Sequence, residues 1–178
     1  LQSPEFAAQR IITEYLAPRR EFLYTTQTIA NGGLIPEAQN GNPPIEITQI
    51  EFNPQSRNQL EEFVVLTNPT DTTVDISDWT LGGDIAHTFD PGTVLLPGGS
   101  IYVAANAISF RARSEGPTGG MRLFVQGNYE GTLPNEGGTV RLLARDGTLM
   151  TETSYTGSVN VLQNHLRIGE VMYHPLSP

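Results

Sequence analysis

Leu60-Glu-Glu-Phe-Val-Val-Leu-Thr-Asn-Pro69 and Val74-Asp-Ile-Ser-Asp-Trp-Thr-Leu81 are two runs of β-branched and aromatic residues, each set off by turn-forming residues. Side chains of these kinds are enriched in strands because they pack well on a pleated surface. Asn-Pro, Asp and the later Pro97-Gly98-Gly99 mark turns, since they fix or permit the backbone angles of a chain reversal. The two runs are therefore predicted to be short strands.

Similar runs recur at short intervals after Pro44, with turn residues between them. No segment among them is long and periodic enough to be a crossover helix, and short strands at this spacing are typical of a β-sandwich. The predicted fold class is therefore all-β. Strands are expected at residues 45–52, 63–67, 74–81, 87–89, 93–96, 101–105, 123–126, 139–144 and 149–155.

Composition narrows the classes of function. The 178 residues, which include 18 Gly and 13 Pro, suit one turn-rich domain with appendages. The net charge is −9 and all ten basic residues are Arg, so phosphate backbones would be repelled and no nucleic-acid partner is expected. Cys is absent, which excludes disulfides and thiolate ligands. No apolar run approaches the ~20 residues of a membrane-spanning helix, so no transmembrane segment is expected.

Residues 1–31 are predicted to be the helical tail of an upstream region. Ser3 can cap a helix, Pro4 suits the first helical position, and apolar residues then recur with a period near 3.6. Pro18 is expected to break or restart this helix, with a second short helix through residues 19–24. Residues 32–44 have turn composition and are predicted to be a linker. The β domain is expected over residues 45–157.

The end of the chain repeats a pattern from the start of the predicted sandwich. Apolar positions of Ile45-Glu-Ile-Thr-Gln-Ile-Glu-Phe-Asn-Pro54 reappear in Leu166-Arg-Ile-Gly-Glu-Val-Met-Tyr-His-Pro175. Residues 158–178 are therefore predicted to be a joint and the first strand of a truncated second domain. The unpaired strand at 166–173 could also pair with an open sheet edge, either of its own molecule or of a neighbour, and pairing with a neighbour would give a strand-exchange dimer. Because the chain begins at Leu1 without Met, we expect it to be a piece of a longer polypeptide.

The predicted β domain contains a set of short motifs: Phe52-Asn53-Pro54, Asn68-Pro69, the run 74–81, Leu96-Pro97-Gly98-Gly99 and Gly137-Gly138-Thr139-Val140-Arg141-Leu142. Over roughly residues 45–157 these motifs together resemble the lamin tail domain family as bacteria use it. The resemblance implies an immunoglobulin-like β-sandwich in a secreted or cell-surface protein. The helical tail resembles the end of a spore-coat (CotH) kinase-like region, but none of a kinase-like catalytic core accompanies it, so no catalytic residue is carried over.

The single Trp of the chain, Trp79, has two interpretations. A carbohydrate-binding site would expose it beside another aromatic residue, such as Tyr102 or Tyr129. In an immunoglobulin-like sandwich a strand Trp usually belongs to the core, and we predict the core position. Further core residues are expected to be Phe63, Val65, Ile76 and Phe89.

Acidic residues cluster around the second run and raise the question of a metal site. Asp71, Asp75, Asp78 and Asp84 could supply hard oxygen ligands for calcium. Their spacing is not that of an EF-hand, and Asp is common in turns, so no metal ligand and no cofactor are assigned. The enzymatic alternative is a metal-assisted hydrolase that uses Asp75, Asp78, Asp84 and His87.

Two neighbouring acids, Glu61 and Glu62, cannot meet over one substrate, since neighbours on a strand point to opposite faces. Glu62 is instead expected to pair with an Arg such as Arg141. The basic residues Arg111, Arg113 and Arg122 flank the loop 114–120. They suit an anionic glycan, an envelope polymer or a phospholipid head group, and the alternative is an ordinary solvated rim.

The sequence shows no catalytic constellation. The leading hypothesis is a non-catalytic interaction or tethering module of a larger bacterial protein that is secreted or held at the cell surface. The alternative is a carbohydrate-binding or cell-envelope-binding module that uses the three Arg residues. The expected partner is a protein or a cell-envelope polymer.

Overall fold

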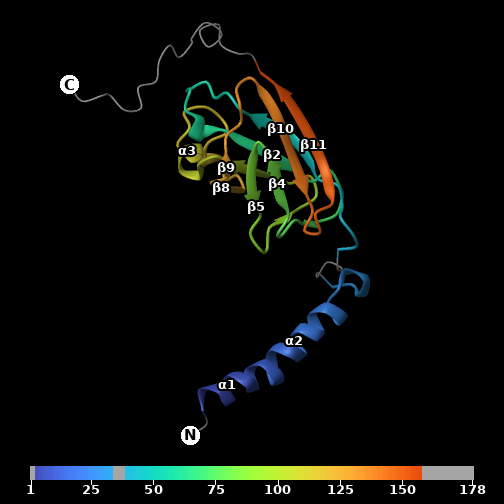
Figure 1. The fold of residues 1–178 in the computed structure, drawn as a ribbon. Helices are drawn as coiled ribbons and strands as arrows, with labels where there is room; N and C mark the ends of the chain where they lie inside the picture. The colour runs from blue at the N-terminus through green and yellow to red at the C-terminus, as the bar shows by residue number, and fades with distance from the viewer. Residues whose placement is uncertain (1–2, 34–38, 158–178) are drawn as a thin grey trace, which may run out of the picture. The chain divides into compact units, whose positions relative to one another are not determined.

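The computed structural model describes residues 3–33 and 39–157. The chain divides into two compact units between Pro43 and Pro44, and each is described by itself. The first unit is helical, and the second holds the strands (Figure 1). The predicted truncated strand and the strand-exchange dimer fall on residues 158–178, which lie outside the described residues.

A helix of 23 residues, from position 4 to position 26, forms most of the first unit. Ser3 caps it, because its Oγ accepts a hydrogen bond from the Phe6 N–H at 3.3 Å. The helix has the segments α1 (Pro4–Arg10), η1 (Ile11–Leu16), α2 (Ala17–Glu21) and η2 (Phe22–Thr26), and a short 3₁₀ turn, η3 (Ile29–Asn31), follows it. No helix of the described residues is both long enough and apolar enough to span a membrane.

The predicted break at Pro18 is wrong, and the predicted second helix is part of the same helix. The π-helical segment η1 ends at Leu16, two residues before Pro18, and the Ala17 N–H bonds to the Ile12 carbonyl. In an α-helix the proline ring meets the carbonyl of the residue four positions earlier. The wider π turn relieves that contact, so the helix continues past Pro18.

The second unit is a β-sandwich, which confirms the predicted fold class of an all-β, immunoglobulin-like domain with an N-terminal helix. Its neighbouring strands run antiparallel except β7 and β8, which are parallel. One sheet has the order β1 (Glu46–Glu51), β2 (Phe63–Thr67), β7 (Ser100–Ala104), β8 (Val125–Gly127). The other has the order β11 (Leu149–Thr156), β10 (Gly137–Leu143), β4 (Thr80–Gly83), β5 (Ile85–Thr88), β9 (Glu130–Gly131). A short ribbon pairs β3 (Val74–Asp75) with β6 (Val94–Leu95).

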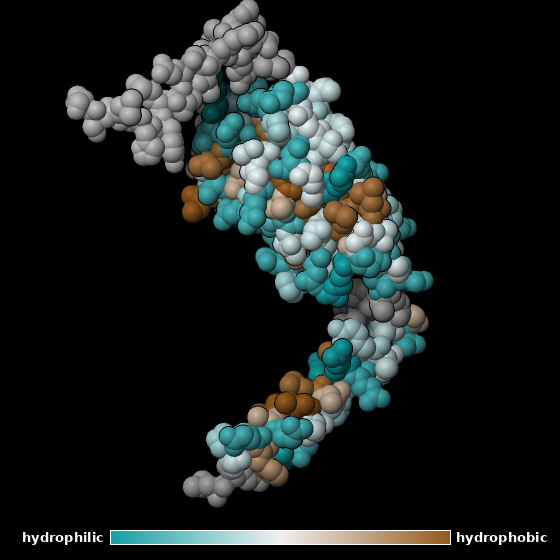
Figure 2. All heavy atoms as spheres, viewed as in Figure 1, coloured by the Kyte–Doolittle hydropathy of each residue, from teal (hydrophilic) through white to brown (hydrophobic). Residues whose placement is uncertain are grey.

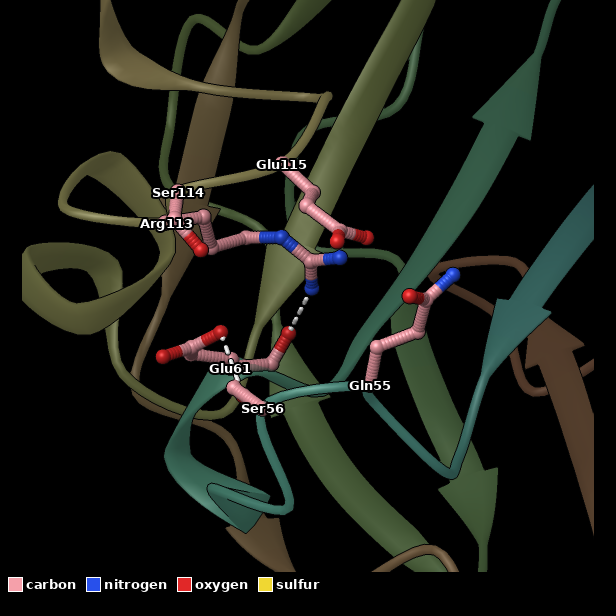
Figure 3. A pocket seen from close by; sticks show the side chains of 6 residues that line it. All are labelled: Gln55, Ser56, Glu61, Arg113, Ser114 and Glu115. Carbon is pink, nitrogen blue, oxygen red and sulfur yellow. Dashed lines mark hydrogen bonds between the residues drawn. The ribbon is translucent and has the colours of Figure 1, made fainter.

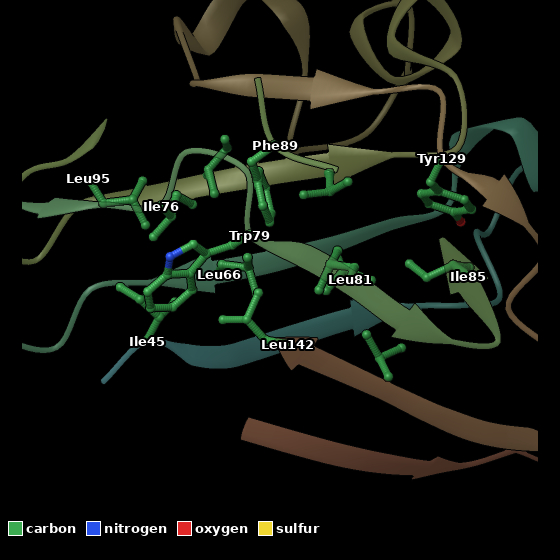
Figure 4. Close-up of a cluster of buried hydrophobic side chains, with 14 of the residues drawn as sticks. Ile45, Leu66, Ile76, Trp79, Leu81, Ile85, Phe89, Leu95, Tyr129 and Leu142 are labelled. Atoms are coloured by element: carbon green, nitrogen blue, oxygen red, sulfur yellow. The ribbon is translucent and has the colours of Figure 1, made fainter. Parts of the chain in front are cut away.

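The main hydrophobic cluster fills the space between the two sheets (Figure 4). Trp79 is 3% exposed and belongs to this cluster, so its ring does not lie on a ligand-binding face. Ile76 and Phe89 are fully buried in the same cluster. Both sheets contribute: Val64, Leu66, Ile101 and Val103 come from one, and Leu81, Ile85, Val140 and Leu142 from the other.

A second cluster covers the outer face of the four-stranded sheet. The short helix α3 (Ala107–Arg111) follows β7 and places the buried Phe110 ring 5.3 Å from the Phe63 ring. Neighbouring strand residues point to opposite faces, so a strand covered on both sides is buried throughout. Strand β2 is such a strand, because Phe63 and Val65 pack in this second cluster with Ala104 and Phe110.

The structure differs from the prediction at the run 74–81 and at two short elements that were not predicted. The run 74–81 is not one strand, because Trp79 N–H bonds to the Ile76 carbonyl at 3.1 Å and Asp78 adopts a left-handed φ of 60°, which turns the chain between β3 and β4. Helix α3 and strand β9 were not predicted, because elements of five and two residues are too short to show a period. Two 3₁₀ turns, η4 (Gln59–Glu61) and η5 (Gly119–Met121), lie beside α3.

Candidate functional site

A polar pocket of about 160 Å³ lies where β1 ends and β2 begins. Three segments form it: the loop after β1, the turn η4, and the chain that leaves α3. The lining includes two carboxylates, one guanidinium, two hydroxyls and one carboxamide (Figure 3). These side chains belong to Gln55, Ser56, Glu61, Arg113, Ser114 and Glu115.

The loop after β1 fixes the carboxylate of Glu61. The Ser56 hydroxyl donates to Glu61 Oε2 at 2.8 Å, and the Asn58 amide donates to Oε1 at 3.2 Å. Asn58 also caps η4, because its Oδ1 accepts from the Leu60 N–H at 3.2 Å. Each carboxylate oxygen can accept a second hydrogen bond, so Glu61 keeps acceptor capacity toward the pocket.

Arg113 is held by contacts that involve no carboxylate. Its Nη1 donates to the backbone carbonyl of Glu61 at 2.5 Å, and its guanidinium carbon lies 5.0 Å from the centre of the Phe63 ring. Its Nε is buried without a hydrogen-bond partner. The ring face attracts the cation and the carbonyl fixes its direction, so the guanidinium is anchored as one wall of the pocket.

Glu115 is exposed and lies on the other side of the Arg113 guanidinium from Glu61. With its amide nitrogen turned toward Glu115, Gln55 donates to both oxygens of that carboxylate, at 3.1 and 3.2 Å. Figure 3 shows the Arg113 guanidinium between Glu61, Gln55 and Glu115. No ion pair within 4.0 Å joins Arg113 to either carboxylate among the residues that the structure describes. Two carboxylates and one guanidinium therefore leave the pocket with a formal charge of −1.

Exposed apolar side chains come from the segments around α3. Ile108 of α3 is 81% exposed, which is unusual for a residue of its kind in a folded domain. Leu60 of η4, Met121 of η5 and Phe124 before β8 are also exposed, and η4, η5 and β8 each contact α3. Figure 2 shows hydrophobic atoms on the side of the sandwich where α3 lies. We call these four residues the α3 surface.

The structure separates the three candidate Arg residues. Arg111 and Arg122 are exposed and lie on neighbouring segments, because Gly119 of η5 packs against the backbone of Arg111. Arg113 instead faces the pocket, with two glutamates in the same lining. An anionic ligand that contacts all three guanidinium groups would therefore also meet the pocket carboxylates. The binding of an anionic polymer through Arg111, Arg113 and Arg122 stays a prediction.

The candidate metal ligands have separate structural partners. Asp75 accepts hydrogen bonds from the Ser77 N–H at 2.9 Å and from its hydroxyl at 2.5 Å, and Asp78 pairs with Arg145. Asp84 Oδ2 accepts from the Thr139 N–H at 2.6 Å. Over positions 3–33 and 39–157, no group of three or more His, Asp or Glu side chains is arranged to hold a metal ion.

Asp84 and His87 each have a structural explanation. A Cβ on Gly138 would stand 1.8 Å from Asp84 Oδ2, so a residue without a side chain lets this carboxylate reach β10. His87 Nε2 lies 3.3 Å from Gln126 Oε1, and its ring meets the Phe89 ring edge-on at 5.1 Å. Burial lowers the pKa of His87. The residues considered for a metal-assisted hydrolase thus hold turns and strands in place.

Glu62 does not pair with Arg141, contrary to the prediction. Arg141 pairs across β10 and β11 with Glu152, at the surface. Glu62 is only 1% exposed, and its Oε2 accepts from the Tyr129 hydroxyl at 3.2 Å and from the Leu133 N–H at 3.3 Å. Burial raises the pKa of Glu62, because the charged form loses more hydration than these two donors replace. Glu61, the last residue of η4, thus lines the pocket, and Glu62, which follows it, is buried in the interior.

The pocket was not predicted from the sequence. Gln55, Ser56, Ser114 and Glu115 were not identified as candidates, because nothing in their spacing links the loop after β1 to the chain after α3. Glu61 and Arg113 were considered for other roles, one as an acid and one as part of a basic patch. The contact of Arg113 with the Glu61 carbonyl joins positions 52 residues apart, and no local pattern encodes it.

The comparisons with known proteins agree with the fold. No curated protein matches the chain. Residues 38–157, more than half of the chain, match the family described as Lamin Tail Domain, whose domains are generally non-catalytic. The match begins seven residues before the predicted start of the domain at residue 45. The chain therefore belongs to the lamin tail domain family.

Proposed function

We propose that this lamin tail domain is a non-catalytic protein-interaction module that tethers a larger bacterial protein, secreted or at the cell surface. The observation that carries the proposal is the α3 surface. Its four apolar side chains are exposed although the neighbouring Phe110 is fully buried. Exposed apolar groups on one side of a soluble domain are a common mark of a protein-binding site.

The arrangement of polar groups supports a binding function over catalysis. The carboxylates considered for chemistry are engaged with backbone N–H groups, hydroxyls or Arg side chains. Such bonds hold loops and strands in place, and within residues 3–33 and 39–157 they leave these carboxylates without the arrangement of an acid and base pair over one open site. Family membership points the same way, because these domains are generally non-catalytic.

The position of α3 also supports a binding function. The helix is short, yet Phe110 anchors it to the sheet through contacts with the Phe63 and Tyr102 rings. Asn106 caps its start, because its Oδ1 accepts from the Ser109 N–H at 2.9 Å. A capped and anchored helix presents Ile108 in a fixed place, and preordered contact residues lower the entropic cost of binding.

The test compares the chain carrying Ile108→Asp with the unchanged chain. Each is immobilised and exposed to secreted and envelope protein fractions, and captured proteins are quantified by mass spectrometry. We expect Ile108→Asp to reduce capture of a specific partner about tenfold or more, since buried contacts at an interface centre dominate binding. The melting temperature should not change, because Ile108 is exposed.

The matched control is Leu149→Asp, which places the same charge on an exposed apolar residue of β11 in the other sheet. It should leave capture unchanged. Equal capture by the unchanged chain and Ile108→Asp, with both folded, would contradict an interaction through the α3 surface.

A further inference from the structure

We propose that the pocket between Glu61, Arg113 and Glu115 receives the ammonium group of a lysine side chain of the partner protein. This inference rests on the proposed protein-binding function and assigns a chemistry to one part of the contact. Nothing in the lamin tail domain assignment identifies this pocket. Three features of the pocket support the proposal: the charges of its lining, its fixed geometry and its place beside the α3 surface.

The charge of the pocket favours a cationic ligand. The two carboxylates and the one guanidinium leave a formal charge of −1, which a single lysine ammonium would neutralise. The whole chain carries −9, so its long-range field also favours a basic partner. An anionic group would enter the same space against two carboxylates and would have to compete with the Glu61 carbonyl for Arg113.

The contacts of Arg113 leave the two glutamates accessible to a ligand. Arg113 does not neutralise the glutamates by pairing, because the Phe63 ring and the Glu61 carbonyl hold its guanidinium in place. Glu61 and Glu115 receive hydrogen bonds only from neutral hydroxyl and amide groups among the partners found for them. Both carboxylates therefore keep spare lone pairs that a cationic donor can use.

The shape of the pocket favours an ammonium over a guanidinium. A lysine ammonium is a compact charge with three donors, and Glu61, Glu115 and the Ser56 and Ser114 hydroxyls offer acceptors around it. An arginine of the partner would want an aromatic face or a planar pairing with one carboxylate. The Phe63 ring that could supply such a face is already covered by Arg113.

The neighbouring surface is the third feature that supports the proposal. Leu60, part of the α3 surface, is adjacent in sequence to Glu61, so the pocket lies at the border of the apolar patch. Protein interfaces commonly join an apolar centre to a charged rim. The four methylene groups of a lysine can cover apolar surface while the ammonium reaches a polar site.

The first experiment uses nuclear magnetic resonance and the complete chain, with Nα-acetyl-lysine N-methylamide as the probe. We expect weak binding, roughly millimolar as for an exposed ion pair, with shifts at Gln55, Ser56, Glu61 and Ser114. Raising the ionic strength to about 0.5 M should weaken it, since the charges are open to solvent. The Nε-acetylated probe, which lacks the charge, should not bind.

Two further probes test the alternatives. Nα-acetyl-aspartate N-methylamide carries an anion, and stronger shifts from it than from the lysine probe would contradict the proposal. Alanine N-methylamide carries an α-ammonium without the long stem. Equal binding of this probe would contradict a lysine site and indicate a general cation site.

Substitutions at Glu115 test whether the lysine probe binds in this pocket. Glu115→Gln should weaken binding of the lysine probe roughly two- to fivefold, the range expected for losing one exposed charge partner. Glu115→Lys should abolish it. Glu46→Gln removes the same charge from an exposed residue of β1 outside the pocket, and it should have no effect. A Glu115→Gln variant that binds as well as the unchanged chain would overturn the proposal.

The outcome is separable from that of the proposed function. If Ile108→Asp abolishes partner capture and Glu115→Gln leaves both the probe and the partner bound, the domain binds protein but not through a lysine in this pocket. If Ile108→Asp leaves capture intact while Glu115→Lys abolishes it, the α3 surface is not the contact and the pocket proposal stands. If the lysine probe binds but Glu115→Lys leaves capture of the partner intact, the pocket binds a free ammonium only, and the protein-bound form stated here is wrong.

Discussion

The outer faces of the two sheets of the sandwich differ: one is apolar and covered, and the other is polar and exposed. On the four-stranded sheet, Phe63 and Val65 of β2 point outward and are covered by α3. On the five-stranded sheet, Thr139 and Arg141 of β10 point outward and meet Ser154 and Glu152 of β11 in the open. Alternation is the same in both strands, so the identity of the outward residues makes the difference.

An apolar outer face needs a cover, and the cover has consequences for function. Helix α3 buries Phe63 but turns Ile108 toward solvent, and the chain that leaves α3 brings Arg113 to Glu61. The polar face of the other sheet needs no such layer. Both proposed contact regions therefore lie on the covered side, where an added layer of chain creates a new surface.

The largest effect should come from Phe110→Ala, which removes the ring that joins α3 to the sheet. Phe110 is fully buried against Phe63 and Tyr102, so the change leaves a cavity and should lower the free energy of unfolding by about 3–5 kcal/mol. Ile108→Ala on the same helix is the control, and exposure should limit its cost to about 0.5 kcal/mol. Urea denaturation measures both, and similar small losses would mean that α3 is not a true cover.

A smaller effect concerns Glu62, which faces the inner side of β2 with Val64 and Leu66. Burial raises its pKa in the folded state above the value in the unfolded chain. The folded protein then holds this proton to higher pH, so the stability it contributes is complete below the unfolded pKa and is lost as pH rises through the folded pKa. Glu62→Gln cannot titrate and should lack this loss.

The measurement is the free energy of unfolding of both chains across the acid to neutral range. The difference between Glu62→Gln and the unchanged chain should shift in favour of the variant as pH rises. His87 also has a perturbed pKa, but it is present in both chains, so the difference isolates Glu62. A difference that stays constant with pH would refute a raised pKa at Glu62.

The sequence predicted the sandwich because strand formation is local. Runs such as 63–67, closed by Asn68-Pro69, carry their own turn chemistry, and β2 was found with the predicted bounds. Asn68 is fully buried, and its side-chain oxygen accepts from the Thr70 N–H at 3.0 Å. Such turn residues act within a few positions of themselves, which is why reading along the chain can find them.

The pocket could not be predicted in the same way. Its walls come from three segments, and the five-residue helix that orients Arg113 is too short to show a hydrophobic period. The Glu62 prediction failed for a related reason: opposite charges suggested Arg141, but the fold places Glu62 inside and Arg141 on the open face. Long-range contacts decide both cases, and charge sign alone does not identify a partner.

The smallest effect should come from a substitution on the exposed outer face of the five-stranded sheet. Arg141 and Glu152 form an exposed ion pair across β10 and β11, so Arg141→Ala should cost less than about 1 kcal/mol. Thermal unfolding of Arg141→Ala, Glu152→Ala and the variant with both changes gives the coupling energy between the two side chains. Added salt should reduce this coupling energy, because solvent ions screen exposed charges. A coupling well above this range, insensitive to salt, would mean that the open face carries as much of the stability as the covered face. The contrast between the two sheets would then lie in chemistry alone and not in energy.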